Sequence, residues 1–227
     1  MKLVIFDCDG TLVDSADEIA ANMRATFESL NLTWPGQAAT RRCIGLSLPQ
    51  TMQNLHPQGS TQTHEALVEA YRNLFYNSSE AVRQRPQGGQ VFFDGALEAL
   101  ARLRQRDDVL LAIATGKSQR GVTRMLANAE IPRSAFVSVQ TADDAPSKPN
   151  PAMVLQAMAE AGGIGGHNTV MIGDASYDIE MARAAGAFAL GVEWGYHPVD
   201  ILQRSGAHKI MSHFNQMDDI LDGFWEQ

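Results

Sequence analysis

Short apolar runs recur along the chain at intervals that predict buried strands. They are rich in valine, isoleucine, leucine or phenylalanine and lie at residues 3–6, 109–113, 135–139, 169–172 and 187–192. An apolar run of this length without polar alternation is typical of a strand that is buried on both faces, as in parallel sheets. We therefore predict a strand at each of these places.

Helical patterns separate several of these runs. The apolar residues that would share a helical face are Val122, Met125, Leu126 and Ala129 in one segment, and Val154, Leu155 and Met158 in the next. Strands that alternate with helices fold as a parallel sheet with helices on both faces. The expected fold class is α/β, with a doubly wound, Rossmann-like parallel sheet.

One long segment interrupts this alternation. Residues 15–90 contain no convincing strand but carry two helical stripes, formed by Ile19, Met23, Phe27 and Leu30 and by Leu67, Tyr71, Leu74 and Phe75. An insert that leaves the carboxyl end of a strand lies over the ligand crevice of such a sheet. We predict a small helical cap domain at residues 15–90 and a catalytic core made of residues 1–14 and 91–227, with connections near 14–15 and 86–89.

Composition fits a globular chain and narrows the range of partners. The 227 residues are 44% hydrophobic and 19% charged, which argues against disorder. A net charge of -8 and the lack of a basic cluster with interleaved aromatics argue against nucleic acid and anionic membranes as partners.

The two cysteines and six histidines lack the spacing of zinc ligands. No apolar run approaches the ~20 residues of a membrane span and no signal peptide is evident, so we expect a cytoplasmic protein.

The strongest chemical signal directly follows the first predicted strand, where the chain reads Asp7-Cys8-Asp9-Gly10-Thr11. An aspartate can attack phosphorus and form an acyl phosphate. A second carboxyl group nearby can protonate the leaving oxygen and later deprotonate water. Gly10 lets the backbone turn sharply and approach an anion. The string therefore predicts carboxylate chemistry at phosphorus.

Three further motifs with polar side chains follow later predicted strands. Thr115 precedes Gly116, and a hydroxyl with exposed backbone amides there could hold phosphate oxygens. Lys148 lies in a proline-stiffened turn, where a lysine can neutralise charge on phosphate and nucleophile. Asp174 and Asp178 offer carboxylates to a hard cation, and magnesium prefers one or two carboxylates with waters and a phosphate oxygen. Doubly wound sheets bind ligands at these strand ends.

With these motifs the chain resembles the haloacid dehalogenase superfamily of aspartate-nucleophile hydrolases, in its phosphatase branch. The resemblance spans nearly the whole chain, with DxDGT at 7–11, threonine at 115, lysine at 148 and GDxxxD at 173–178. Phosphoglycolate phosphatases resemble it most, because they share DGTLVDS at 9–15 and SKPxP at 147–151. The helical insert matches the smaller type of cap in this family.

The resemblance implies a role for each motif residue. The implied assignments are Asp7, Asp9, Thr115 and Lys148 in catalysis, Asp7, Asp9, Asp174 and Asp178 around Mg²⁺, and Gly10, Thr11, Gly116, Arg42 and Gly45 at the substrate. In these roles Asp7 carries the phosphoryl group, while Asp9 acts as general acid and then as general base. Arg42 and Gly45 lie where the family often places substrate-contacting cap residues, although a solvated helix end explains the arginine equally well.

The expected function is a magnesium-dependent phosphatase that acts on a small phosphorylated metabolite, such as phosphoglycolate or a sugar phosphate, through an aspartyl phosphate. A phosphosugar mutase of the same superfamily retains all four motifs and stays open as an alternative. The dehalogenases lack a second aspartate, which this chain has as Asp9. A phosphate-accepting signalling module is remote, because its phosphoacceptor lies on a later strand. The sequence leaves the substrate and the oligomeric state open.

Overall fold

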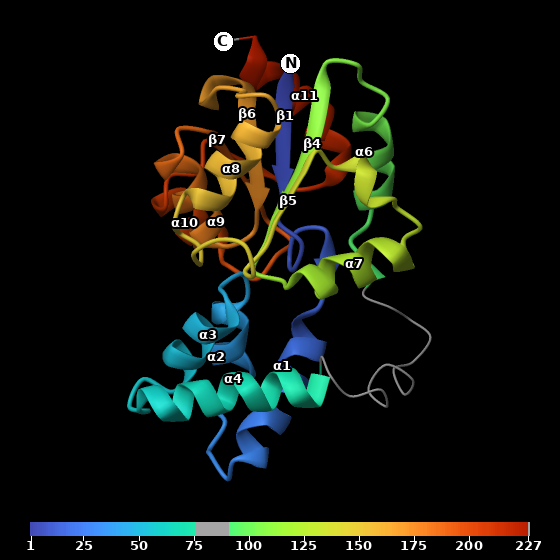
Figure 1. Ribbon diagram of the computed structural model, residues 1–227. Helices are drawn as coiled ribbons and strands as arrows, with labels where there is room; N and C mark the ends of the chain where they lie inside the picture. The colour runs from blue at the N-terminus through green and yellow to red at the C-terminus, as the bar shows by residue number, and fades with distance from the viewer. Residues whose placement is uncertain (76–90, 227) are drawn as a thin grey trace.

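The computed structural model describes residues 1–75 and 91–226. Figure 1 shows two parts, an α/β part in which helices flank a sheet and a smaller helical part. The helical part follows the first strand of the sheet in the sequence. It lies beyond the ends to which the parallel strands point (Figure 1), where the sequence predicts the ligand chemistry.

Parallel strands form a six-stranded sheet in the spatial order β5-β4-β1-β6-β7-β8. Their bounds are β1 (Lys2–Phe6), β4 (Val109–Ala114), β5 (Ser138–Gln140), β6 (Thr169–Gly173), β7 (Phe188–Val192) and β8 (Lys209–Met211). β1 lies between β4 and β6, so that Leu3 is opposite both Leu110 and Thr169. This order and the parallel pairing confirm the predicted doubly wound fold.

Alternate side chains of β1 point to opposite faces of the sheet. Val4 and Phe6 belong to one buried apolar cluster, and Leu3 and Ile5 belong to another. The first cluster includes residues of α6 (Ala96–Leu103), α7 (Gln119–Asn128) and α11 (Met217–Trp225), and the second includes residues of α8 (Ala152–Glu160), α9 (Ser176–Ala184) and α10 (Val199–Arg204). Both faces of the sheet are therefore covered, which explains the uninterrupted apolar runs of its strands.

The two edges of the sheet differ from the sequence prediction. The run at 135–139 is a strand only at its end, because a short 3-10 turn, η1 (Arg133–Ala135), comes first and β5 begins at Ser138. Phe136 is apolar because it packs into the core from the loop between them. At the other edge, the sequence does not predict β8. Its three residues range from exposed to buried, so they form no uninterrupted apolar run. The remaining 3-10 turns are η2 (Gly166–Asn168) and η3 (Phe214–Gln216).

Helix α8 packs against the core through Val154 and Met158, as predicted, but Leu155 departs from the predicted face. Its buried residues are Met153, Val154 and Ala157, whereas Leu155 is 46% exposed. Met153 and Ala157 are one helical turn apart, so they form the stripe that packs on the sheet. The prediction for Leu155 is wrong because a helix with apolar residues at several successive positions allows more than one buried face.

The helical part has its own buried core. It consists of α1 (Ala16–Ser29), α2 (Gln37–Cys43), α3 (Leu48–Leu55) and α4 (Thr61–Phe75). Met23 and Phe27 of α1 meet Leu67 and Tyr71 of α4 in one apolar cluster, as the helical stripes predict. Leu74, which the sequence assigns to the same stripe, is 37% exposed.

A two-stranded antiparallel ribbon marks where the chain enters and leaves the predicted cap. Strand β2 (Val13–Asp14) pairs with β3 (Val91–Phe92), and the Phe93 N–H donates to the Leu12 carbonyl at 2.9 Å. The predicted first connection at 14–15 therefore adjoins this ribbon, whereas the second, at 86–89, lies outside the described residues. The division into residues 15–90 and the rest stays a prediction.

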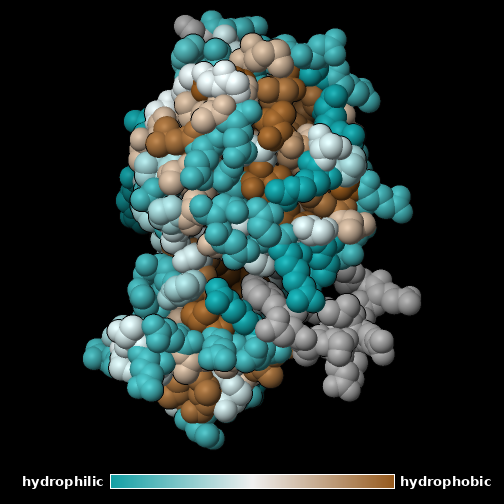
Figure 2. Space-filling model, viewed as in Figure 1, coloured by the Kyte–Doolittle hydropathy of each residue, from teal (hydrophilic) through white to brown (hydrophobic). Residues whose placement is uncertain are grey.

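The surface is mostly polar on the face that Figure 2 shows, and the two parts meet at a narrower waist. Large exposed apolar side chains, such as Val91 and Leu97, belong to different elements of the α/β part. In residues 1–75 and 91–226, no helix is both long enough and apolar enough to cross a membrane.

The packing of α8 yields a stability prediction. We expect Met153→Ala to lower the free energy of unfolding by about 2–4 kcal/mol, because it leaves a cavity against the sheet. Leu155→Ala, which removes a half-exposed side chain from the same helix, should cost less than about 1 kcal/mol. Urea unfolding of both variants measures the difference, and equal losses would contradict the observed helix orientation.

Candidate active site

The predicted catalytic residues meet at the carboxyl ends of neighbouring strands. Asp7 directly follows β1, Thr115 directly follows β4 and Asp174 directly follows β6. The Asp7 N–H donates to the Ile172 carbonyl at 2.9 Å, which continues the β1–β6 ladder into the site. Because these three strands are adjacent and parallel, residues far apart in the sequence share one edge of the sheet.

A buried lysine joins two of the carboxylates. Lys148 Nζ lies 2.8 Å from Asp7 Oδ1 and 2.6 Å from Asp178 Oδ1, and the Lys148 side chain has no exposed surface. The other Asp178 oxygen accepts a hydrogen bond from the Ala175 N–H at 3.0 Å. Burial alone would lower the pKa of Lys148, but the Asp178 and Asp7 carboxylates outweigh burial and hold the pKa above its ordinary value. Lys148 is therefore a fixed positive charge beside Asp7.

Three carboxylates converge on one point that suits a cation. Asp7, Asp174 and Asp178 each offer a ligand atom, and these atoms lie within 4.8 Å of one another. Asp174 is oriented by the Thr11 hydroxyl, which donates to Oδ1 at 3.0 Å, and by the Tyr196 N–H, which donates to Oδ2 at 2.8 Å. Buried carboxylates this close together repel one another unless a cation or a proton intervenes.

The Asp7 carboxylate is buried and only partly paired. Asp7 Oδ2 is buried and has no hydrogen-bond partner or ion pair among the described residues, while Oδ1 meets only Lys148 in an ion pair. Burial raises the pKa of Asp7 to about 7, even though Lys148 acts in the opposite direction. Burial also raises the pKa of Asp174, with the charges of Asp178 and Asp7 adding to the effect. A hard divalent cation at this point would satisfy the free oxygen and stabilise the ionised carboxylates.

Gly10 gives Asp174 the room it occupies. Its backbone has a φ of +84°, and a Cβ at this position would lie 2.2 Å from Asp174 Oδ2. A side chain would therefore strain the turn and collide with a candidate metal ligand. Glycine is needed at residue 10 to bring the turn after β1 against Asp174.

The Asp9 carboxylate is held by two residues to which the sequence analysis gives no role. Both Lys117 Nζ and the Ser15 hydroxyl contact Asp9 Oδ1. Burial alone would lower the pKa of Lys117. The Asp9 charge has the opposite effect and contributes to a pKa above the ordinary value of lysine. Ser15 and Lys117 lie within or beside the recognised motifs, at the end of DGTLVDS and just after Gly116. Their proximity to Asp9 depends on how two distant loops fold together, which no local pattern reveals.

Thr115 and Tyr196 complete the surroundings of the carboxylates. The Thr115 hydroxyl accepts a hydrogen bond from the Lys117 N–H at 3.2 Å. The Tyr196 hydroxyl accepts from the Ser15 N–H at 2.8 Å and donates to Asp14 Oδ1 at 3.0 Å. Tyr196 thereby links the Asp174 side of the site to the chain that enters the helical part.

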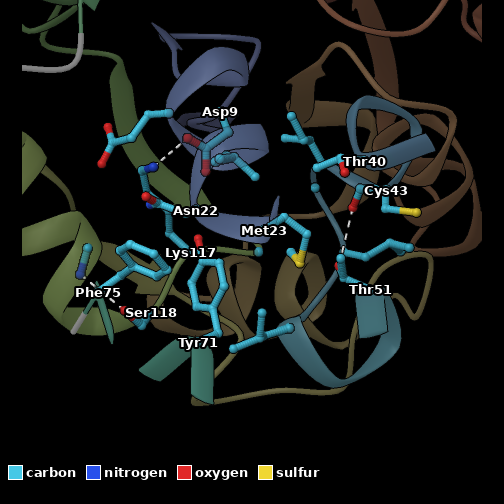
Figure 3. A pocket seen from close by; sticks show the side chains of 18 of the residues that line it. Asp9, Asn22, Met23, Thr40, Cys43, Thr51, Tyr71, Phe75, Lys117 and Ser118 are labelled. Carbon is cyan, nitrogen blue, oxygen red and sulfur yellow. Dashed lines mark hydrogen bonds and ion pairs between the residues drawn. The ribbon is translucent and has the colours of Figure 1, made fainter. Parts of the chain in front are cut away.

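A cavity of ≈ 90 Å³ lies between the two parts of the molecule, next to Asp9. Its lining includes Asp9, Asn22, Gly45, Tyr71, Lys117 and Arg124. In Figure 3, Lys117 points toward Asp9, with Asn22 and Tyr71 nearby on the side of the helical part.

The two predicted cap contacts differ in their placement. Gly45 lines the cavity, and its carbonyl oxygen would lie 2.5 Å from a Cβ on Gly116, so the lack of a side chain at Gly116 allows the two parts to touch. Arg42 has an exposed side chain that is not part of the cavity lining, while its carbonyl oxygen accepts hydrogen bonds from Tyr177 and His197. The remaining predicted contact, Thr11, is buried against Asp174.

Comparison with known proteins links this site to one family. The family model for haloacid dehalogenase-like hydrolases matches residues 4–192. "Probable phosphatase IndB" of Dickeya dadantii is 34% identical over 217 residues, covering 95% of this chain and 91% of the relative. A phosphoglycolate phosphatase of Mesorhizobium japonicum is 26% identical over 219 residues, covering 95% and 92%. The crystal structure of a hydrolase from Pseudomonas syringae shares the fold, with a TM-score of 0.82, 24% identity and coverage of 98% and 99%.

The raised pKa of Asp7 predicts how stability depends on pH. Without a cation, Asp7 ionises near its ordinary pKa of 3.8 in the unfolded chain but only at about 7 in the folded protein. The unfolded state therefore gains stability relative to the folded state as the pH rises through this interval, and the folded protein loses stability. A divalent cation should raise the melting temperature more at pH 8 than at pH 5.

Thermal unfolding with a chelator and with excess Mg²⁺ at both pH values measures this effect. We expect Asp7→Asn to reduce the pH dependence of the metal-free protein, because residue 7 then no longer ionises. A melting temperature that rises from pH 5 to pH 8 in chelator for the wild type, with no such rise for Asp7→Asn, would contradict the inferred shift.

Proposed function

The chain belongs to the haloacid dehalogenase-like hydrolase family, and we propose that it is a magnesium-dependent phosphatase that acts on a small phosphorylated metabolite. The observation that carries this proposal is the buried Asp7 carboxylate, which has Lys148 on one oxygen and no hydrogen-bond partner among the described residues on the other. A carboxylate with a free oxygen beside a fixed cation is suited to attack an anionic phosphoryl group. The phosphatase names of the two curated relatives support the same reaction class.

In the first half of the proposed reaction, an Asp7 oxygen forms a bond to phosphorus as the bond from phosphorus to the leaving oxygen breaks. Asp9 gives its proton to that oxygen, so the product leaves as an alcohol. Lys117 and Ser15 hold one Asp9 oxygen, which leaves the other to face the leaving group. Lys148 offsets the negative charge that gathers on the phosphoryl oxygens.

In the second half, Asp9 accepts a proton from water as the water oxygen bonds to phosphorus. The bond between phosphorus and the Asp7 oxygen breaks, inorganic phosphate leaves and both aspartates return to their starting states. The Thr115 hydroxyl accepts from the Lys117 N–H and would donate its own proton to a phosphoryl oxygen. Phosphoryl transfer depends mainly on this kind of positioning and charge neutralisation.

Magnesium fits the donor set of the site. Asp7, Asp174 and Asp178 supply buried carboxylate oxygens, and the family resemblance adds the main-chain carbonyl of Asp9. When bound, the ion would offset negative charge on the phosphoryl group and on the carboxylates. These residues would hold it through hard oxygen ligands, which magnesium prefers.

The cavity supports a small substrate. Its ≈ 90 Å³ lie next to Asp9, where a leaving group of a few heavy atoms, such as glycolate, would be placed. The phosphoglycolate phosphatase relative makes phosphoglycolate the first candidate, and a small sugar phosphate is the next. Gly45 remains a proposed substrate contact because it lines this cavity.

The reaction is tested by phosphate release from a panel of phosphate esters that includes phosphoglycolate. We expect turnover with Mg²⁺ but not with a chelator, and a loss of at least about a thousandfold in Asp7→Asn, which lacks the nucleophile. Asp107→Asn makes the same chemical change at an exposed residue before the amino end of β4, the end of that strand opposite to Thr115, and should keep wild-type rates. The proposal fails if no ester is hydrolysed although Mg²⁺ and phosphate bind, or if Asp7→Asn remains as active as Asp107→Asn.

A second prediction concerns selectivity. Arg124 lines the cavity, and its side chain has no hydrogen bond or ion pair to another described residue, whereas the Arg42 side chain is exposed outside the cavity. We expect Arg124→Met to change the ranking of substrates by about tenfold, chiefly for esters with a charged leaving group. Arg42→Met should change it less. The ratios of kcat/KM across the panel measure both effects, and the reverse order would return the selectivity role to Arg42.

A further inference from the structure

One short segment of the helical part lies against the α/β part. It runs from the end of α2 to the start of α3, over residues 42–47, and we name it the crossing segment. Gly45 and Leu46 approach Gly116 so closely that a Cβ there would lie 2.5 Å from the Gly45 oxygen. The Ser47 N–H donates to the Ser147 hydroxyl oxygen at 2.9 Å. The crossing segment thus forms part of the cavity wall and also holds the two parts together.

A single carbonyl group of this segment accepts two hydrogen bonds from the α/β part. The Tyr177 hydroxyl donates to the Arg42 oxygen at 3.0 Å, and His197 Nε2 lies 3.2 Å from the same oxygen. The two donor rings are themselves in contact, with centroids 5.3 Å apart and an angle of 71° between their planes. Both donors therefore reach the Arg42 carbonyl from one side of the site.

The tautomer of His197 follows from its other nitrogen. Nδ1 accepts a hydrogen bond from the Ser176 N–H at 3.2 Å, so in the neutral ring the proton is on Nε2. Nε2 can then donate to the Arg42 carbonyl. His197 is 8% exposed, which shields this bond from competing water.

Each of these contacts is close in sequence to a residue of the active site or to one that binds it. Tyr177 immediately precedes Asp178, and Ser147 immediately precedes Lys148. His197 follows Tyr196, whose N–H binds Asp174. The position of the crossing segment is thereby tied to the backbone that carries the candidate metal ligands.

We propose that Tyr177 and His197 are positioning residues that hold the crossing segment closed over the active site through the Arg42 carbonyl. Without their hydrogen bonds, the helical part separates more often from the α/β part, and the cavity opens. The site beneath is taken from the proposed phosphatase function, but the closing contact itself does not depend on any substrate. The main chain of residue 42, rather than its side chain, performs this role.

The two cysteines of the chain can be used to detect such opening. Cys43 belongs to the crossing segment and is 7% exposed, with one side in the apolar cluster of the helical part and the other lining the cavity. Cys8 has no exposed surface and belongs to the apolar cluster on one face of the sheet. Separation of the two parts would open the cavity side of Cys43 and leave Cys8 buried, whereas unfolding of the whole protein would expose both thiols.

The test is the rate at which a maleimide modifies each cysteine in the full chain without substrate, followed by peptide mass spectrometry. Loss of one hydrogen bond of about 1 kcal/mol corresponds to roughly a fivefold larger open population. We expect Tyr177→Phe and His197→Ala each to speed Cys43 modification by about this factor. The double variant should exceed the product of the two single effects, because the Arg42 carbonyl then loses both donors.

A control variant and the second cysteine make the test decisive. Gln37→Ala removes an exposed hydrogen bond to Asp17 that stays within the helical part, and it should leave the Cys43 rate unchanged. The proposal is overturned if the double variant modifies Cys43 at the wild-type rate, or if Cys8 and Cys43 accelerate together. Failure of the phosphatase proposal would show instead as absent phosphate release in the wild type, while the labelling result would stand.

Discussion

The ion pairs of Lys148 with Asp7 and Asp178 are the interaction on which the active site depends. Each of the three charges is buried, and burial of a single charge would be costly unless opposite charges and hydrogen bonds offset it. The offset requires the end of β1, the start of α9 and the loop before α8 to meet at hydrogen-bonding distance. The central position of β1 and its two parallel ladders supply that accuracy. The rigid sheet therefore explains how a carboxylate can be kept buried with one oxygen available for chemistry.

Much of this arrangement could be predicted because it follows from the sheet. The run before Asp7 is buried on both faces, so its apolar pattern has no interruption and identifies the strand directly. Once the strands are parallel, residues at their carboxyl ends must share one edge. That rule connects Asp7, Thr115 and Asp174 without any knowledge of side-chain contacts, and the family match agrees with it.

The parts that the sequence could not predict depend on packing between distant segments. Leu155 is as apolar as Met153, and only the sheet decides which of them is buried. Lys117 reaches Asp9 across two loops, and a lysine in a loop is usually solvated. Arg42 is prominent in the sequence for its charge, yet its described contacts to the α/β part run through its carbonyl oxygen. A main-chain contact leaves no trace in the residue type.

The antiparallel ribbon of β2 and β3 affects how the inserted helical part can diverge during evolution. Because the entering and leaving strands are paired, the two ends of the inserted helices are fixed side by side whatever lies between them. An insertion whose ends are close together disturbs the host sheet little. A differently shaped insert could therefore replace the helices between β2 and β3, by evolution or by design, while the aspartates of the site stay in position. The chemistry and the choice of substrate can then diverge independently along one chain.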